Sequence, residues 1–96
     1  MKIKEVQISL SKQAHKDLRR VPGFIVDKLQ VWIDGVLYDG LSRVRKIPGY
    51  HDEPLQGKRF GQRSIRLSKS YRMIYRIDED DSIELIEILE VNKHDY

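Results

Sequence analysis

Residues 62–77 read QRSIRLSKSYRMIYRI, in which two segments of alternating polar and apolar residues are separated by Ser68-Lys69-Ser70. Successive side chains of a strand point to opposite faces, so Ile65 and Leu67 fall on one face and the polar residues between them on the other. Residues 71–77 alternate in the same way. The pattern predicts two neighbouring strands joined by a short turn, with one apolar face and one arginine-bearing face.

A third strand is predicted at residues 83–91, where apolar residues occur on both faces, as expected for a central strand. Residues 3–10 also alternate like a half-buried strand. Ser11 follows as a helix N-cap and opens a short helix that extends to Arg20. Apolar residues three and four apart then predict a longer amphipathic helix from about residue 24 to residue 38.

Residues 41–57 contain Pro48-Gly49, Pro54 and Gly57, residues that interrupt helices and strands, so this segment is predicted to be a loop. The resulting order is one strand, two helices and a three-stranded antiparallel meander. We therefore expect a small α+β domain with the helices packed on one face of the sheet. The 96 residues leave room for one domain, which covers residues 1–96.

The composition excludes several classes of protein. The chain has no cysteine, so it has no disulfide scaffold, thiol nucleophile or thiolate metal site. Its apolar stretches are too short to span a membrane and its first residues lack a signal-peptide core, so we expect a cytoplasmic protein without a membrane partner. The three histidines lack a metal-ligand spacing, and no glycine-rich phosphate loop is present. We expect no metal and no other cofactor.

Charge is distributed unevenly along the chain. The net charge is only +3, but residues 41–76 carry ten Lys or Arg against two Asp or Glu, a net +8. Residues 77–96 carry one basic and eight acidic residues, a net −7. The basic segment is either a surface for a polyanion or a solvated face that the acidic strand beside it neutralises.

The arginines of the two strands suggest phosphate chemistry. Guanidinium groups at Arg66 and Arg72 flank one short turn and could clamp a phosphate and stabilise charge developing on it. The C-terminal residues His94 and Tyr96 supply groups that transfer protons. RNA carries its own nucleophile in the 2′-hydroxyl, so its cleavage needs no metal. The simpler alternatives are that the arginines only pair with Glu84 or Glu87, and that the last residues have no task.

Four segments taken together resemble the RelE/ParE toxin superfamily. They are Pro54-Leu55-Gln56-Gly57, residues 61–67 (GQRSIRL), residues 71–75 (YRMIY) and residues 91–96 (VNKHDY). Within the superfamily the chain is most similar to RelE and HigB-type mRNA interferases of bacterial type II toxin–antitoxin systems. The resemblance implies a RelE-like fold and an endoribonuclease that cleaves mRNA at the ribosome. It also implies a cognate antitoxin that silences the toxin in a hetero-oligomer.

The resemblance also implies roles for single residues. Arg66 matches a strand position that holds a catalytic lysine or histidine in relatives, and Arg72 matches the arginine that stabilises the phosphate. His94 and Tyr96 resemble the basic residue and the tyrosine near the relatives' C-terminus. Several relatives place a histidine just before the Pro-Leu-x-Gly loop, where this chain has Glu53. His51 lies two residues earlier, so the general base is left open among Glu53, His51, His94 and Tyr96. The expected RNA or ribosome contacts are basic residues around these positions, namely Lys58, Arg59, Arg63, Lys69 and Lys93.

Two other functions remain open from the sequence. One is a ParE-like toxin that binds DNA gyrase and catalyses nothing itself, since the fold alone does not decide activity. The other is a non-catalytic RNA-binding protein, whose affinity for RNA falls with salt but which leaves no cleaved ends. The titratable C-terminal residues beside a basic face favour the nuclease.

Overall fold

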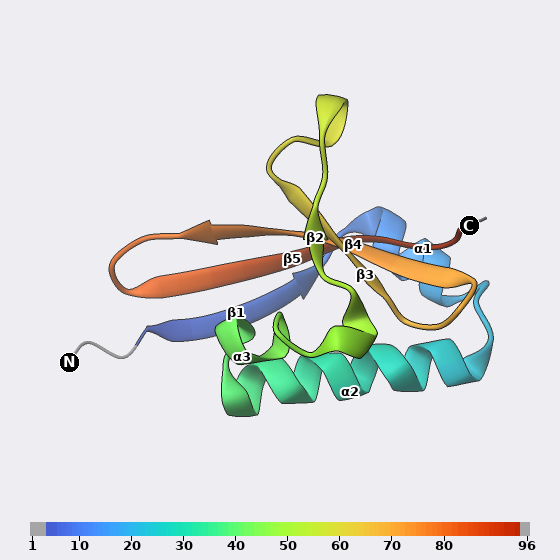
Figure 1. Cartoon of the computed structure of the whole chain (residues 1–96), viewed down its shortest axis with the longest axis horizontal. Helices are drawn as coiled ribbons and strands as arrows, with labels where there is room; N and C mark the ends of the chain where they lie inside the picture. Colours follow the sequence, from blue (N-terminus) through green and yellow to red (C-terminus); the bar gives the residue numbers. More distant parts are fainter. Residues whose placement is uncertain (1–3, 95–96) are drawn as a thin grey trace.

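Five strands form one mixed sheet in the computed structural model, which describes residues 4–94. The strands are β1 (Glu5–Leu10), β2 (Glu53–Pro54), β3 (Gln62–Arg66), β4 (Tyr71–Glu79) and β5 (Ile83–Lys93). Their order across the sheet is β1-β5-β4-β3-β2 (Figure 1). β3, β4 and β5 form the predicted antiparallel meander. β1 pairs parallel with β5, so β5 is a central strand, as its apolar residues on both faces predict.

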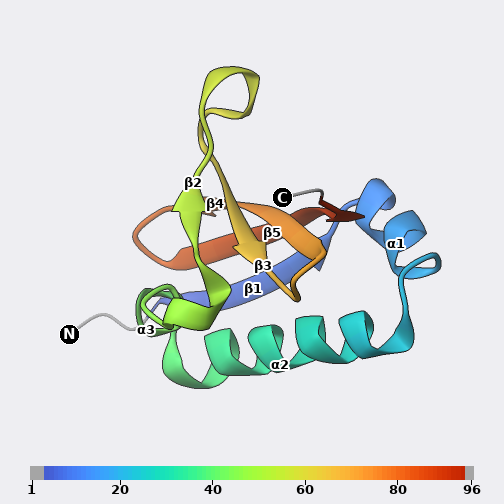
Figure 2. The ribbon, with the colours of Figure 1, turned by 45° about the vertical axis from the view of Figure 1, so that its right-hand side comes forward.

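Two helices connect β1 to the rest of the sheet. Ser11 caps α1 (Lys12–Leu18) as predicted, because its hydroxyl accepts a hydrogen bond from the Ala14 N–H at 3.0 Å. α1 ends two residues before Arg20, the predicted end of this helix. α2 (Gly23–Asp39) runs along one side of the sheet, and α1 lies at its end (Figure 2).

The core lies between α2 and the sheet. α2 contributes its buried residues at spacings of three and four, and these are Ile25, Leu29, Trp32 and Val36. The sheet contributes the alternate residues of β3, β4 and β5, among them Ile65, Met73, Tyr75, Ile86 and Ile88. The rings of Trp32 and Tyr75 have centroids 5.2 Å apart, a tilted aromatic contact across the two layers. The helices therefore cover one face of the sheet, which confirms the predicted architecture.

The segment predicted to be a loop, residues 41–57, contains regular structure. A short helix, α3 (Leu41–Val44), forms because Leu41 and Val44 lie one turn apart and are both buried. A single 3₁₀ turn, η1, spans Pro48–Tyr50. β2 has only two residues, and its backbone pairs with β3. The segment from β2 to β3, which includes the turn η2 (Gly57–Arg59), projects from the side of the sheet opposite α2 (Figures 1 and 2). Within residues 4–94, no helix is long and apolar enough to cross a membrane.

Candidate functional site

Arginines gather on the face of the sheet that α2 does not cover. On β3 and β4 the charged residues that alternate with the core are Arg66, Arg72 and Arg76, and β5 adds Glu87, Glu90 and Asn92. We call these six residues the arginine face. Arg66 and Arg72 are Cα partners in the antiparallel register of β3 and β4. This register brings two arginines to directly opposed positions at the end of the hairpin.

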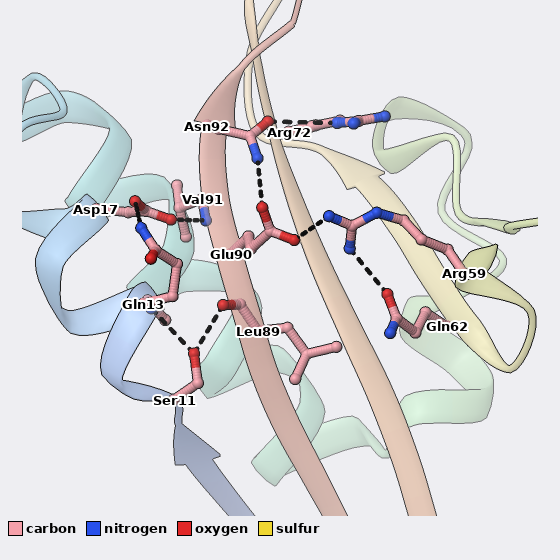
Figure 3. Close-up of polar contacts among 11 residues, drawn as sticks. Ser11, Gln13, Asp17, Arg59, Gln62, Arg72, Leu89, Glu90, Val91 and Asn92 are labelled. Carbon is pink, nitrogen blue, oxygen red and sulfur yellow. Dashed lines mark hydrogen bonds and ion pairs between the residues drawn. The ribbon is translucent and has the colours of Figure 1, made fainter.

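A line of polar contacts crosses the arginine face (Figure 3). The Arg59 guanidinium, at the end of η2, donates to the Glu90 carboxylate and to Gln62 Oε1, the latter at 2.9 Å. Glu90 also accepts a hydrogen bond from Asn92 Nδ2 at 3.3 Å. Asn92 Oδ1 in turn accepts from Arg72 Nε at 3.3 Å. These contacts connect the β2–β3 segment to Arg72. The last of them, with Asn92, holds the Nε edge of the Arg72 guanidinium in place.

The acidic residues of β5 neutralise two arginines of this region. Glu90 forms the ion pair with Arg59, and Glu87 Oε1 lies 2.9 Å from Arg76 Nε. In the described part of the chain, Arg72 contacts the neutral amide of Asn92 and no carboxylate. The alternative in which Glu87 takes up Arg72 is therefore wrong, because Glu87 pairs with Arg76. Arg72 thus keeps a guanidinium that no described carboxylate neutralises, at the end of the hairpin that also carries Arg66.

His94 lies beside the turn that joins these two arginines. Its backbone N–H donates to the Ser70 carbonyl at 2.6 Å, which extends the pairing of β4 with β5 by one step. Because side chains alternate, this register places His94 on the face of Asn92 and Arg72. Lys69 is exposed in the turn itself, whereas Lys93 pairs with Tyr71 and alternates to the other face. Tyr96, the other predicted proton-transfer residue, lies outside the described residues.

The two remaining candidates for a general base lie on and before β2. Glu53 is the Cα partner of Ser64, two residues before Arg66 on β3. His51 Nε2 is 3.8 Å from Glu53 Oε2, and both side chains are more than half exposed. The structure thus brings Glu53 to the strand that carries Arg66, with His51 beside it, and leaves the choice of base open. Lys58 is exposed in η2, on the projecting segment.

Arg63, one of the predicted RNA contacts, points to the other face of the sheet. Its Nε donates to Asp52 Oδ1 at 2.6 Å, and the Asp52 side chain is fully buried. The Tyr75 hydroxyl donates to the other oxygen of the same carboxylate at 2.5 Å. Arg63 therefore holds the segment before β2 against the core, and we do not include it among the proposed RNA contacts.

This buried cluster predicts a loss of stability in alkali. Burial, followed by the hydrogen bond to Asp52, raises the pKa of Tyr75 above its ordinary value near 10. The unfolded chain releases this proton near pH 10 while the folded chain keeps it. We expect the free energy of unfolding to fall above about pH 10 by up to about 1.4 kcal/mol per pH unit from this group, with no such loss below.

Urea denaturation between pH 8 and pH 11 measures this loss. Tyr75→Phe should show a shallower fall above pH 10, whereas Tyr38→Phe, which alters a tyrosine that is 90% exposed, should match the unaltered protein. Equal slopes for all three proteins would contradict the assignment to Tyr75.

Three residues that make polar contacts in this region were not singled out from the sequence. Glu90 and Asn92 are two residues apart on a strand that reads as apolar, so strand alternation could have placed them together on one face. No sequence pattern pointed to Asp52, because it lies in a segment where polar and apolar residues do not alternate. Within residues 4–94, no three histidine or carboxylate side chains are grouped as metal ligands would be.

Comparison with known proteins assigns the chain to a family. The family model described as ParE toxin of type II toxin–antitoxin system, parDE, matches residues 8–95. The chain therefore belongs to the ParE toxin family and, with it, to the RelE/ParE superfamily of type II toxins, as its sequence resemblance predicted. No curated protein sequence matches the chain significantly.

Solved structures of toxins share the fold. YafQ from E. coli strain BL21(DE3) is 21% identical, with 94% of each chain covered and a TM-score of 0.71. The E. coli DinJ–YafQ toxin–antitoxin complex matches with 23% identity over 96% of this chain and 94% of that chain, at a TM-score of 0.68. The archaeal RelE–RelB complex from Pyrococcus horikoshii OT3 matches with 23% identity over 92% and 93%, at a TM-score of 0.68. At these sequence identities the structural similarity shows that this chain shares the fold of these toxins and nothing beyond the fold.

Proposed function

We propose that this toxin is a metal-independent mRNA endoribonuclease that inhibits translation at the ribosome in the cytoplasm. The observation that carries the proposal is the pair Arg66 and Arg72, Cα partners at the end of the hairpin on the arginine face. His94 is attached to the adjoining turn through its bond to Ser70. Two guanidinium groups and an imidazole thus belong to residues that lie together at one end of the sheet.

These groups suit attack by the RNA's own 2′-hydroxyl. The 2′-oxygen forms a bond to phosphorus while the bond to the 5′-oxygen of the next nucleotide breaks, which leaves a 2′,3′-cyclic phosphate and a 5′-hydroxyl. A base takes the 2′-hydroxyl proton and an acid gives a proton to the leaving 5′-oxygen. Arg66 and Arg72 stabilise the negative charge that grows on the phosphate oxygens. Glu53, His51, His94 and Tyr96 are the candidates for the proton transfers.

The intramolecular ion pairs favour phosphate binding at this one position. Arg59 and Arg76 already face carboxylates, whereas Arg72 contacts a neutral amide. A phosphate therefore gains most beside Arg72, and Arg66, the Cα partner of Arg72, lies close enough in the sheet to contact the same phosphate. Beyond the scissile phosphate, the exposed residues Lys58 and Lys69 supply contacts to RNA or ribosome, and Arg59 can exchange Glu90 for a phosphate. Lys93 is exposed on the other face of the sheet and would contact the ribosome from there.

A cognate antitoxin is the expected partner. Relatives of the same fold were crystallised as the DinJ–YafQ and RelE–RelB complexes. The arginine face would accept an acidic segment that neutralises Arg66 and Arg72 and excludes RNA. We therefore propose that the toxin is stored as a toxin–antitoxin hetero-oligomer.

A second candidate function has one observation in its favour, because the matching family model is that of ParE. In this alternative the toxin binds DNA gyrase and does not catalyse a reaction. A basic face suits a protein or nucleic-acid partner equally well, but adjacent proton-transfer groups are needed only for cleavage.

Primer extension on ribosome-programmed mRNA separates these functions. The proposed nuclease should produce discrete new ends within the open reading frame when toxin is added, and none with buffer alone. A parallel incubation of gyrase, plasmid DNA and toxin tests the ParE alternative, and a filter-retention assay tests RNA binding without cleavage. Gyrase-dependent DNA breaks, or RNA retention without new ends, would contradict the endoribonuclease.

A further inference from the structure

A groove of about 670 Å³ opens beside the Arg66–Arg72 pair. α2 forms one wall with Lys28 and Val31, and the η1 region forms another with Ile47 and Tyr50. The end of β3 and the turn after it close the groove with Arg66, Leu67 and Lys69. Among the described residues, Arg66 alone both lines the groove and belongs to the arginine face.

The lining combines an apolar floor with a basic rim. Val31 and Ile47 are 62% and 47% exposed although they are large and apolar, so the groove offers uncovered apolar surface. Tyr50 packs partly against the core and is also a lining residue of the groove. Its burial raises the pKa of its hydroxyl above the ordinary value near 10. The basic rim consists of Lys28, Arg66 and Lys69, and in the described part of the chain none of the lining residues is acidic.

We propose that this groove binds one nucleotide of the RNA substrate, adjacent to the phosphate held by Arg66 and Arg72. The base lies against Tyr50 and the apolar floor, since every base has a planar face that stacks on an aromatic ring. The nucleotide's phosphate lies between Lys28 and Lys69. This inference rests on the proposed endoribonuclease function.

Two features favour a nucleotide over a peptide segment as the occupant. The apolar and basic residues of the groove are complementary to a ligand in which a flat apolar group lies close to an anionic group. A nucleotide has both groups, namely the base and the phosphate. The groove also shares Arg66 with the proposed phosphate position, so a single RNA strand can pass from the arginine face into the groove without leaving the basic surface.

Nitrogen-15 NMR titrations of the toxin test the proposal without requiring cleavage. The probes are the four 5′-mononucleotides and a trinucleotide RNA with every 2′-hydroxyl methylated, which cannot be cut. We expect the largest amide shifts at Val31, Gly49 and Lys69. The trinucleotide should bind more tightly than any mononucleotide, because it also reaches Arg66 and Arg72.

Charge reversal at the rim supplies the matched comparison. Lys28→Glu should weaken binding of the trinucleotide about tenfold or more, since it removes one charge-assisted contact and adds a repulsive charge. Lys12→Glu makes the same change in net charge on an exposed position of α1, outside the groove, and should weaken binding less than about twofold. Equal effects of the two substitutions would overturn the proposal.

Other outcomes also decide the matter. If a mononucleotide binds in the groove and the trinucleotide does not, the occupant is a free nucleotide and the RNA assignment is wrong. If a synthetic acidic amphipathic peptide shifts the groove amides while no nucleotide does, the groove is a protein-docking surface and the proposal is wrong. Because these ligands are not cleaved, a groove that fails to bind them is distinguishable from a protein that fails to cut ribosome-bound mRNA.

Discussion

Arg72→Ala is expected to reduce mRNA cleavage by about 10²- to 10³-fold while leaving the protein folded. Removing one preorganised donor from developing charge in a transition state typically has an effect of this size. In the folded protein Arg72 makes a long hydrogen bond of 3.3 Å to Asn92 and no ion pair with a described residue, so its loss removes little that holds the fold. Arg72→Lys keeps the charge but loses the planar fork, and should retain an intermediate rate.

Arg76→Ala provides the matched control on the same strand and the same face. Arg76 pairs with Glu87, away from the Arg66–Arg72 pair, so we expect its removal to lower the cleavage rate less than about tenfold. The rates come from single-turnover primer extension, and urea denaturation checks that both variants are folded. A fully active Arg72→Ala protein, or equal losses for both variants, would show that the phosphate is held elsewhere.

The strands and helices could be predicted because most of them bury one face. Alternation over residues 62–77 determines which side chains of β3 and β4 meet α2, and spacings of three and four determine the buried side of α2. β2 could not be predicted in this way, since two residues are too few to alternate and their conformation depends on backbone pairing with β3. A local sequence pattern also could not predict that β1 pairs in parallel with β5, because most of the chain separates the two strands.

The candidate site was predictable where it depends on alternation and unpredictable where it depends on distant side chains. Arg66 and Arg72 face each other because a short turn joins their strands. The same alternation puts Arg63 on the face of Ile65, so its position among the core residues could have been foreseen. Its partner Asp52 could not, since that residue comes from an irregular segment. The Arg59–Glu90 pair joins residues 31 positions apart in the sequence. In addition, the register of β4 and β5 shifts between Ile74 and Tyr75, next to Glu90, so simple alternation does not place this residue relative to β4.

Asp52→Ala is expected to lower the free energy of unfolding by about 3–5 kcal/mol, because removing one partner of a buried ion pair leaves the other charge uncompensated. Here the loss leaves both the Arg63 guanidinium and the Tyr75 hydroxyl without their carboxylate, 2.6 Å and 2.5 Å away in the folded protein. Urea denaturation near pH 7 measures the change. Asp34→Ala removes an aspartate on the exposed side of α2, hydrogen-bonded to Gln30, and should change stability by less than about 0.5 kcal/mol.

The double variant Asp52→Leu with Arg63→Met separates the cost of an unpaired charge from the need for this segment to be anchored. If the loss in Asp52→Ala arises from the stranded arginine, replacing both partners by apolar side chains should recover a large part of the stability. Such a variant also tests what the cluster does for function, because Asp52 immediately precedes Glu53. A stable double variant that cleaves mRNA normally would show that the cluster serves the fold alone. If it is stable but slow, the Asp52–Arg63 pair positions the β2 segment, with Glu53 and His51, against the strand that carries Arg66.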